Sequence, residues 1–249
     1  MKATVYSIEG KALKQIDLPA VFETPQRGDL VKRAVLSEES RMYQPKGNYK
    51  LAGLETSARY RGRKEDFGTV KNKGIPHLPH EVLPKGQLGK VKRVPHAVKG
   101  RRAHPPKPQK KIVELINKKE HLKALASALS FSTDRSTVLA RAHTDIGVSL
   151  PIVLDHGFEK LSKTKDVLKV LEALKLAEFI EKAKRNGTKS ALIVVSNGMS
   201  RRIGANLPGV DVVRAGELKV RDLAPGTHPG RLTLYSEAAI SELVKRFSA

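Results

Sequence analysis

The 249-residue sequence contains no cysteine and no tryptophan, and aromatic residues make up only 4% of it. Without cysteine there is no disulfide framework, no dithiol redox pair and no thiolate zinc site. Long apolar runs are also missing: the longest uninterrupted aliphatic stretch is 191–195, far short of the about 20 residues of a membrane-spanning helix. Glu9 stands where a secretory signal peptide needs its apolar centre, so we expect a protein that stays inside the cell.

Acidic residues are scarce as well. The chain has 25 Asp and Glu against 47 Lys and Arg, and its net charge is +22. A balance this basic points to a polyanionic partner, and nucleic acid fits better than an anionic membrane surface.

The charge is concentrated in one segment, residues 44–108. This segment has sixteen Lys or Arg, four acids, eight Gly, eight Pro and four His, which leaves a net charge of +12. Ordering a chain costs about 1 to 2 kcal/mol per residue in backbone entropy, and the segment has little apolar surface to offset that cost. The spacing of Gly and Pro excludes long helices and central strands, so we predict an extended, doubled-back loop. Such a loop suits folded RNA better than duplex DNA, because folded RNA offers bulges and crevices into which an extended peptide can thread, so we expect RNA to hold it.

The predicted RNA-binding residues are the cations of this loop together with one histidine. Arg binds phosphate bidentately and also stacks, so the Arg clusters are the first candidates for specific contacts. The full set is Lys46, Lys50, Arg59, Arg61, Arg63, Lys64, Lys71, Lys73, Lys85, Lys90, Lys92, Arg93, Lys99, Arg101, Arg102, His104 and Lys107.

The other special side chains of the loop are its histidines and aromatics. His77, His80, His96 and His104 have no cysteine or spaced carboxylate to complete a zinc site, so we predict no metal and expect the imidazoles to contact bases or phosphates. Two uses remain open for the aromatic rings, stacking on unpaired bases or pinning the loop to itself. These rings are Tyr43, Tyr49, Tyr60 and Phe67.

The sequence outside the loop is typical of a globular α/β domain. Alternating patterns at 3–8 and 12–18 predict a β-hairpin, and Thr24-Pro25 predicts the N-cap and first turn of a helix that runs to about Glu39. A further helix is expected at 117–129, with one apolar face formed by Leu122, Leu125, Ala126 and Leu129. Helices are also expected at 134–142 and over 162–186, the latter with a break near Lys175. The last helix is expected to follow Ser236 and to run through Phe247, with Val244 among its inward residues.

Four short apolar runs predict buried parallel strands: 152–154, 191–195, 210–213 and 232–235. Strands that alternate with helices form layered sheets with right-handed crossovers. We therefore expect a single three-layer α/β domain over residues 1–249, with a small, mostly parallel four-stranded sheet flanked by helices and with 44–108 as its long basic internal loop.

Motifs for small-molecule chemistry are missing. The sequence has no G-x-G-x-x-G after a strand and no G-x-x-x-x-G-K-[ST], so we predict no cofactor and no enzymatic activity. Asp155-His156 follows the first buried strand, where active sites often lie, but no nucleophile motif accompanies it. Two alternatives stay open: an RNA-modifying or RNA-processing factor with a basic arm, and a general nucleic-acid packaging protein.

Several runs resemble ribosomal protein four of the large subunit, of the archaeal and eukaryotic type. They are GQLGKVKRVP at 86–95, GRRAHPPK at 100–107, NKKE at 117–120, KTKDV at 163–167, LEAL at 171–174, LAPG at 223–226 and PGRL at 229–232. Together they cover nearly the whole chain, and the family they resemble is a structural part of the ribosome.

The resemblance implies a cytoplasmic ribosomal protein that binds large-subunit ribosomal RNA, supports subunit assembly and contacts neighbouring ribosomal proteins. It also implies that the tip of the loop, Arg59-Tyr60-Arg61-Gly62-Arg63, lines the peptide exit tunnel and meets the nascent peptide. Here the tip departs from the family, which usually carries more glycines at this point. The segment 185–192 is also short, since relatives tend to insert a second basic loop there.

Overall fold

The computed structural model describes residues 1–143, 146–198, 204 and 206–248. By its internal contacts the chain divides into two compact units. The first, the α/β unit, consists of Met1–Met42 and Val113–Ala249, and the second, the basic unit, is Tyr43–Ile112. The second unit therefore contains the whole of the predicted loop.

The α/β unit is built on one mostly parallel sheet. Its strands are β1 (Lys2–Tyr6), β2 (Ala12–Asp17), β5 (Ile152–Leu154), β6 (Leu192–Val195), β7 (Asp211–Arg214) and β8 (Thr233–Ser236), in the order β2-β1-β5-β8-β6-β7. Only the β1–β2 pair is antiparallel. The α/β class and the four parallel strands are confirmed, but the sheet has six strands and not four.

The two additional strands are the predicted hairpin. β1 runs parallel to β5, with Val5 opposite Val153 and Tyr6 opposite Leu154. Val5 is completely buried by this pairing. Local alternation predicts that a strand forms, but the partner strand lies almost 150 residues away, so the pattern could not show that the hairpin extends the sheet.

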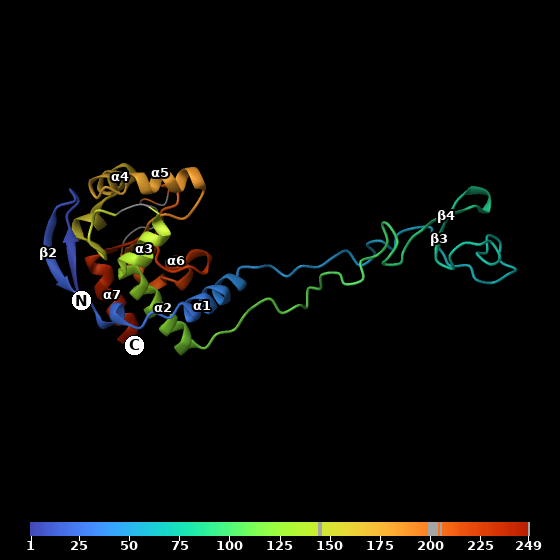
Figure 1. Ribbon diagram of the computed structural model, residues 1–249, viewed down its shortest axis with the longest axis horizontal. Helices are drawn as coiled ribbons and strands as arrows, with labels where there is room; N and C mark the ends of the chain where they lie inside the picture. The colour runs from blue at the N-terminus through green and yellow to red at the C-terminus, as the bar shows by residue number, and fades with distance from the viewer. Residues whose placement is uncertain (144–145, 199–203, 205, 249) are drawn as a thin grey trace. The chain divides into compact units, whose positions relative to one another are not determined.

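Helices cover both faces of the sheet (Figure 1). They are α1 (Gly28–Ser40), α2 (Lys118–Thr133), α3 (Arg135–Ala142), α4 (Thr164–Ala173), α5 (Ala177–Asn186), α6 (Val220–Leu223) and α7 (Glu237–Ser248). One core cluster joins α1, α2, α6 and α7 to one face, and the other joins α3, α4 and α5 to the opposite face. Leu192 and Val194 of β6 point into the first cluster and Ile193 and Val195 into the second, as expected for a strand buried on both sides.

Most helix boundaries follow the sequence signals. Asp134 caps α3, since its carboxylate accepts the Ser136 N–H at 3.1 Å. The predicted break near Lys175 separates α4 from α5, and Lys175 itself has φ +59°. Ser236 caps α7, because its hydroxyl accepts the Ala239 N–H at 3.1 Å.

Three details of the helix predictions are wrong. Thr24 does not cap α1: its hydroxyl donates to the Val21 carbonyl at 2.9 Å, which closes a 3₁₀ turn, and α1 begins only at Gly28. Leu122 is 41% exposed and Val244 is 39% exposed. Both lie at the edge of an apolar stripe, where the side chain reaches solvent instead of the core.

The basic unit contains little regular structure. A two-stranded antiparallel sheet forms from β3 (His80–Val82) and β4 (Leu88–Val91) (Figure 1). His80 of β3 is buried, and so are Ala58 and Val70. The segment thus has a small folded end that its composition did not predict.

Candidate nucleic-acid interface

The cations of the basic unit are not neutralised by any carboxylate of the described residues. Among the described residues, none of the ion pairs involves a residue of Tyr43–Ile112. One of its few carboxylates, that of Glu55, accepts a hydrogen bond from the Tyr49 hydroxyl instead. The positive charge of this unit is therefore available to a polyanion.

Most of the predicted RNA-binding side chains are exposed. The exposed ones are Lys46, Lys50, Arg59, Arg63, Lys64, Lys73, Lys85, Lys90, Lys99, Arg101, Arg102, His104 and Lys107. Arg61, Lys71, Lys92 and Arg93 are half-buried. The sequence thus identified side chains that lie at the surface of one unit.

Three of the half-buried cations hold the unit together. The Arg61 guanidinium donates to the Phe67 carbonyl at 2.5 Å, and the Arg93 guanidinium donates to the Ala58 carbonyl at 3.2 Å. The Lys92 ammonium lies 3.4 Å from the Val98 carbonyl. These side chains keep unused N–H groups, so a structural role does not prevent contact with phosphate.

The predicted tip, 59–63, pairs with two other segments of the unit. The Arg59 N–H donates to the His80 carbonyl at 3.2 Å, and the Val70 N–H donates to the Arg61 carbonyl at 3.1 Å. The side chains of Arg59 and Arg63 remain exposed. The tip is thus a short extended run that presents its arginines outward from a fixed backbone.

Two aromatic rings of the unit each pack against a glycine. A β-carbon on Gly62 would lie 2.9 Å from the Tyr60 ring, and one on Gly86 would lie 2.4 Å from the Phe67 ring. Tyr60 is nevertheless 52% exposed and Phe67 77% exposed. The rings pin the loop to itself and still offer surface on which a base can stack, so the two uses are compatible.

His80 does not have the role expected for it. Its side chain is buried, with Nδ1 2.9 Å from the Gly89 carbonyl oxygen and Nε2 3.0 Å from the Pro76 carbonyl oxygen. It therefore joins segments of the folded end and is not available to stack on bases. His77, His96 and His104 are exposed.

Within the described residues, no group of three or more His, Asp or Glu side chains is placed to hold a metal ion. In that same part of the chain, no helix combines the length and the apolar character needed to cross a membrane.

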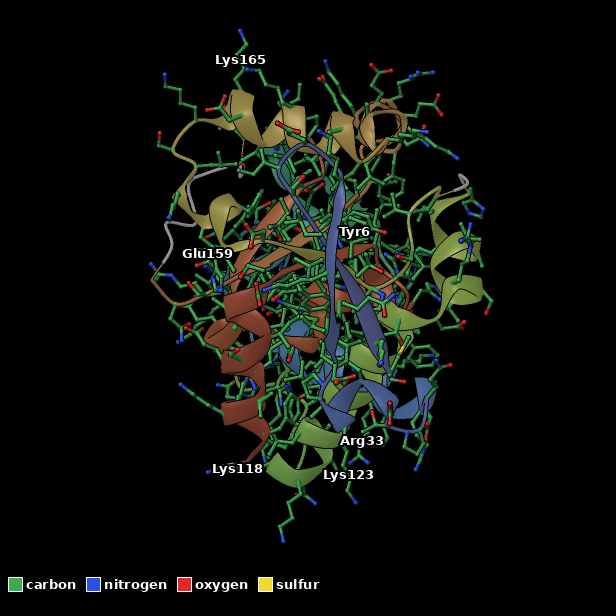
Figure 2. All side chains as sticks on the ribbon, turned by 90° about the vertical axis from the view of Figure 1, so that its left-hand side faces the viewer. Tyr6, Arg33, Lys118, Lys123, Glu159 and Lys165 are labelled. Carbon is green, nitrogen blue, oxygen red and sulfur yellow. The ribbon has the colours of Figure 1, made fainter. Side chains whose placement is uncertain are left out.

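The carboxyl ends of the parallel strands are occupied by a structural carboxylate. Glu159, which is labelled in Figure 2, accepts the Ser196 N–H at 2.9 Å, the Ser196 hydroxyl at 2.8 Å and the Ser236 hydroxyl at 2.5 Å. Burial alone would raise the pKa of Glu159, but these hydrogen bonds and nearby His156 outweigh it and lower the pKa. The edge at which α/β enzymes place their active sites thus serves to join β6, β8 and the turn that follows β5.

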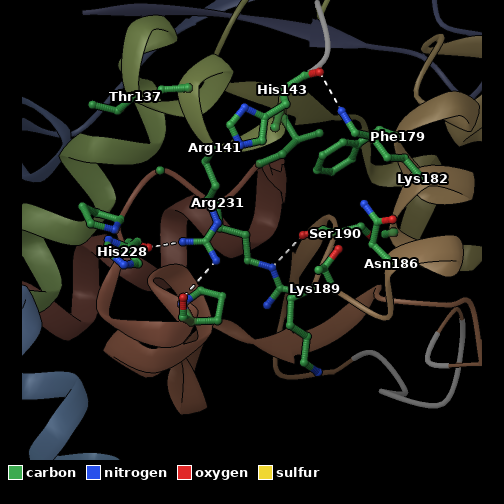
Figure 3. A pocket seen from close by; sticks show the side chains of 18 residues that line it. Thr137, Arg141, His143, Phe179, Lys182, Asn186, Lys189, Ser190, His228 and Arg231 are labelled. Atoms are coloured by element: carbon green, nitrogen blue, oxygen red, sulfur yellow. Dashed lines mark hydrogen bonds between the residues drawn. The ribbon is translucent and has the colours of Figure 1, made fainter.

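The α/β unit also has a basic cavity, with a volume of about 780 Å³ (Figure 3). Its cations already have partners within the chain: Arg141 donates to the carbonyls of His228 and Pro225, Lys182 donates to the His143 carbonyl at 2.7 Å, and Lys189 pairs with the Asp211 carboxylate at 2.7 Å. Burial, reinforced by nearby Arg231, lowers the pKa of Arg141. The cations of this cavity therefore stabilise the fold, as Arg61, Lys92 and Arg93 do in the basic unit, whereas the exposed cations of that unit have no such partner among the described residues.

Comparison with known proteins decides between the remaining alternatives. The profile of the ribosomal protein L4/L1 family matches residues 16–246. The chain belongs to the ribosomal protein L4/L1 family. It is 42% identical over 265 residues to the large ribosomal subunit protein uL4 of Methanocaldococcus jannaschii, an alignment that covers 99% of this chain and 100% of that protein.

Two other members of the family show the same full-length similarity. Identity is 42% over 266 residues with the large ribosomal subunit protein uL4 of Methanococcus vannielii and 40% over 263 residues with that of Halorubrum lacusprofundi. Each alignment covers 99% of this chain and 100% of the relative. The resemblance to the archaeal type is confirmed, and a ribosomal protein of this family is a structural constituent and not an enzyme.

Proposed function

We propose that this protein is a constituent of the large ribosomal subunit and binds large-subunit ribosomal RNA through residues 44–108. The observation that carries the proposal is the high density of exposed Lys and Arg in a unit that makes no ion pair among the described residues. Such cations bind a partner that supplies many phosphates at fixed positions, and the family membership names the ribosome as the source of that partner.

The α/β unit contributes further contacts to this role. In its sequence the loop is an internal extension of one α/β domain that spans residues 1–249. The domain presents further exposed cations, among them Lys118, Lys123 and Lys165, which project outward in Figure 2. This outer surface faces neighbouring ribosomal proteins and additional RNA, and the protein supports assembly of the subunit by joining them to the RNA that holds the loop.

We also propose that the tip, 59–63, lines the peptide exit tunnel and meets the nascent peptide. The fixed backbone of the tip and its exposed Arg59 and Arg63 support this, because a tunnel wall needs side chains that a passing peptide cannot displace. The proposal for the tip depends on the ribosomal location but is tested separately.

Ultraviolet crosslinking in cells tests the RNA proposal. The attached RNA is sequenced and the crosslinked peptides are mapped. We expect adducts at a few positions of large-subunit ribosomal RNA, concentrated on residues 44–108. Adducts scattered over many transcripts, or confined to the α/β unit, would contradict the proposal and favour a processing factor or a general nucleic-acid binder.

The tip proposal is tested with stalled ribosomes whose nascent peptide carries a photoreactive amino acid. When that amino acid is moved stepwise along the nascent peptide, one narrow window of positions is expected to crosslink to residues 59–63. If no position yields a crosslink to this protein, the tip does not line the tunnel, whatever the outcome of the RNA crosslinking.

A further inference from the structure

The basic unit contains a cavity between two of its segments, 48–54 and 101–106, which we call its two arms. Its volume is about 390 Å³, near the lower end of the range of ligand pockets in proteins. Segments 48–54 and 101–106, which are about fifty residues apart in sequence, supply its walls. The lining residues are Asn48, Lys50, Ala52, Leu54, Arg101, Arg102, Pro105 and Pro106.

Close contact between the backbones of the two arms forms this cavity. Gly53 has φ +75°, and a β-carbon there would lie 2.6 Å from the backbone nitrogen of Arg101 and from the carbonyl oxygen of Gly100. Real β-carbons do not approach backbone atoms so closely, so only glycine allows the arms to meet at this point. The cavity is therefore a specific feature of the fold of this unit and not a gap between mobile side chains.

The charged groups of the cavity all have one sign. Lys50, Arg101 and Arg102 line it, and no Asp or Glu does. The structure shows no hydrogen bond or ion pair from these three side chains to any of the described residues. In the larger cavity of the α/β unit, by contrast, Arg141 and Lys182 donate to backbone carbonyls. The smaller cavity thus presents cations that are available to an anionic group.

The remaining lining is suited to a flat, partly apolar group. Leu54, Pro105 and Pro106 offer apolar surface, and a proline ring packs well against the face of a base. Asn48 uses its amide Nδ2 to donate to the Tyr49 carbonyl at 3.0 Å, which leaves its amide oxygen available as an acceptor. A duplex is far too wide for a cavity of this volume, whereas one unpaired nucleotide offers both a flat base and a phosphate.

We propose that this cavity binds a single unpaired nucleotide of the RNA that the basic unit contacts. The phosphate lies against Arg101, Arg102 and Lys50, and the base packs against Pro105, Pro106 and Leu54. The proposal rests on the proposed function, because the nucleotide belongs to large-subunit ribosomal RNA. It adds that one extruded base fixes the position of the two arms on the RNA, in addition to the diffuse attraction of the other cations.

The test is chemical probing of archaeal large-subunit ribosomal RNA, at single-nucleotide resolution, with the full-length protein bound. Three forms are compared: the wild type, Gly53→Ala and Gly74→Ala. Gly74 is the matched control, since it also has a positive φ, +64°, but a β-carbon on it would meet nothing within 4 Å. Both substitutions strain the backbone, and only the one at Gly53 pushes the arms apart.

We expect the wild type and Gly74→Ala to protect the same unpaired nucleotide. Gly53→Ala is expected to leave that nucleotide reactive, to keep most of the remaining footprint and to bind about tenfold more weakly. Ultraviolet crosslinking of the wild type should attach peptides from both 48–54 and 101–106 to that nucleotide. If Gly53→Ala and Gly74→Ala give the same footprint, or if the two peptides attach to different nucleotides, the single-nucleotide site is wrong.

A second pair of variants removes charge without changing the backbone. Arg101→Gln with Arg102→Gln should restore reactivity at the same nucleotide, whereas Lys110→Gln with Lys111→Gln, which removes equal charge outside the cavity, should not. Free mononucleotides at the same concentration as the RNA are expected not to compete with it for the protein, since the arms also contact the rest of the RNA. Competition would show instead that the cavity binds a free nucleotide. If the wild type does not bind this RNA at all, the proposed function fails, and if it binds without protecting an unpaired nucleotide, only this inference fails.

Discussion

The Nη2 atom of Arg231 lies 2.7 Å from the Oδ2 atom of Asp211, although the arginine side chain is only 2% exposed. The same guanidinium donates to the carbonyls of Ser190, Ala191 and Gly209 at 2.7 to 3.1 Å and to that of Asp222 at 3.0 Å. Burial lowers the pKa of Arg231, and the Asp211 carboxylate opposes that effect. This one side chain therefore joins the approach to β6, the approach to β7 and the helix α6.

Arg231→Lys should destabilise the α/β unit by about 3 kcal/mol. A lysine ammonium cannot reach all of these acceptors, and each charged hydrogen bond that is lost costs about 1.5 to 3 kcal/mol. Thermal unfolding followed by circular dichroism measures the change. Arg185→Lys is the control, because the Arg185 side chain is 77% exposed and its one ion pair among the described residues is with Glu181 on the same helix. Equal unfolding temperatures for the two variants would show that the Arg231 contacts contribute little.

His80→Ala should loosen the folded end of the basic unit without unfolding the α/β unit. The substitution removes the two contacts to the Gly89 and Pro76 carbonyls and leaves a cavity where the buried ring lay. Hydrogen exchange measured by mass spectrometry should become faster in 58–91 and remain unchanged in 118–142. His77→Ala, which changes an exposed histidine three residues away, is expected to leave both regions as in the wild type.

Deletion of 44–108 should leave a folded domain that no longer binds RNA tightly. The two ends of the insertion are held together within the α/β unit: the Ser37 hydroxyl donates to the Glu114 carbonyl at 2.7 Å, and the Ser40 hydroxyl accepts the Glu114 N–H at 3.0 Å. A short glycine linker can therefore close the gap. Loss of far-ultraviolet circular dichroism in the deletion variant would mean that the fold needs the loop, and full RNA affinity would mean that the loop is not the anchor.

Binding to ribosomal RNA should weaken steeply with salt, and loop arginines should carry much of that dependence. Each phosphate contact changes the slope of log K against log salt by about 0.7 to 0.9. Arg59→Gln with Arg63→Gln should therefore reduce the slope by about 1 to 2, whereas Lys163→Gln with Lys184→Gln should reduce it by less. Equal reductions would mean that diffuse charge carries the affinity. Arg246 is unsuitable as a control, since its guanidinium donates to the carbonyls of Ala215 and Leu218 at 2.9 Å.

Acid should destabilise the α/β unit partly through Glu159. Its pKa in the folded protein lies below the ordinary 4.5, so the unfolded chain takes up a proton first as the pH falls. The stability that Glu159 contributes is complete above pH 4.5 and is lost as the pH falls through the folded pKa. Glu159→Gln should be less stable than the wild type at pH 7 and should lose less of its remaining stability between pH 5 and pH 3. Glu178→Gln, on an exposed part of α5, should retain the dependence of the wild type.

The local patterns of the sequence predicted strands correctly where the pattern depends on burial. The runs around Ile152–Leu154 and Leu192–Val195 predicted strands because a strand buried on both faces needs apolar residues at every position. Asp134 and Ser236 predicted helix starts because a cap acts on residues two or three positions away. Thr24 led to a wrong helix start, because its hydroxyl bonds backward to the Val21 carbonyl and closes a turn instead of capping the following helix.

By itself the sequence determined that the chain combines an α/β domain with a basic segment that lacks the acids to neutralise it. Both conclusions depend on composition and local periodicity, which involve only residues that are close together in the sequence. Only the tertiary structure decided which of the special residues face outward. His80 looks like a binding residue in the sequence, yet it is buried and its ring nitrogens lie against backbone carbonyls. The cavity at Gly53 depends likewise on two segments about fifty residues apart. Contacts of this kind form only when distant segments meet, and no local pattern encodes the partner.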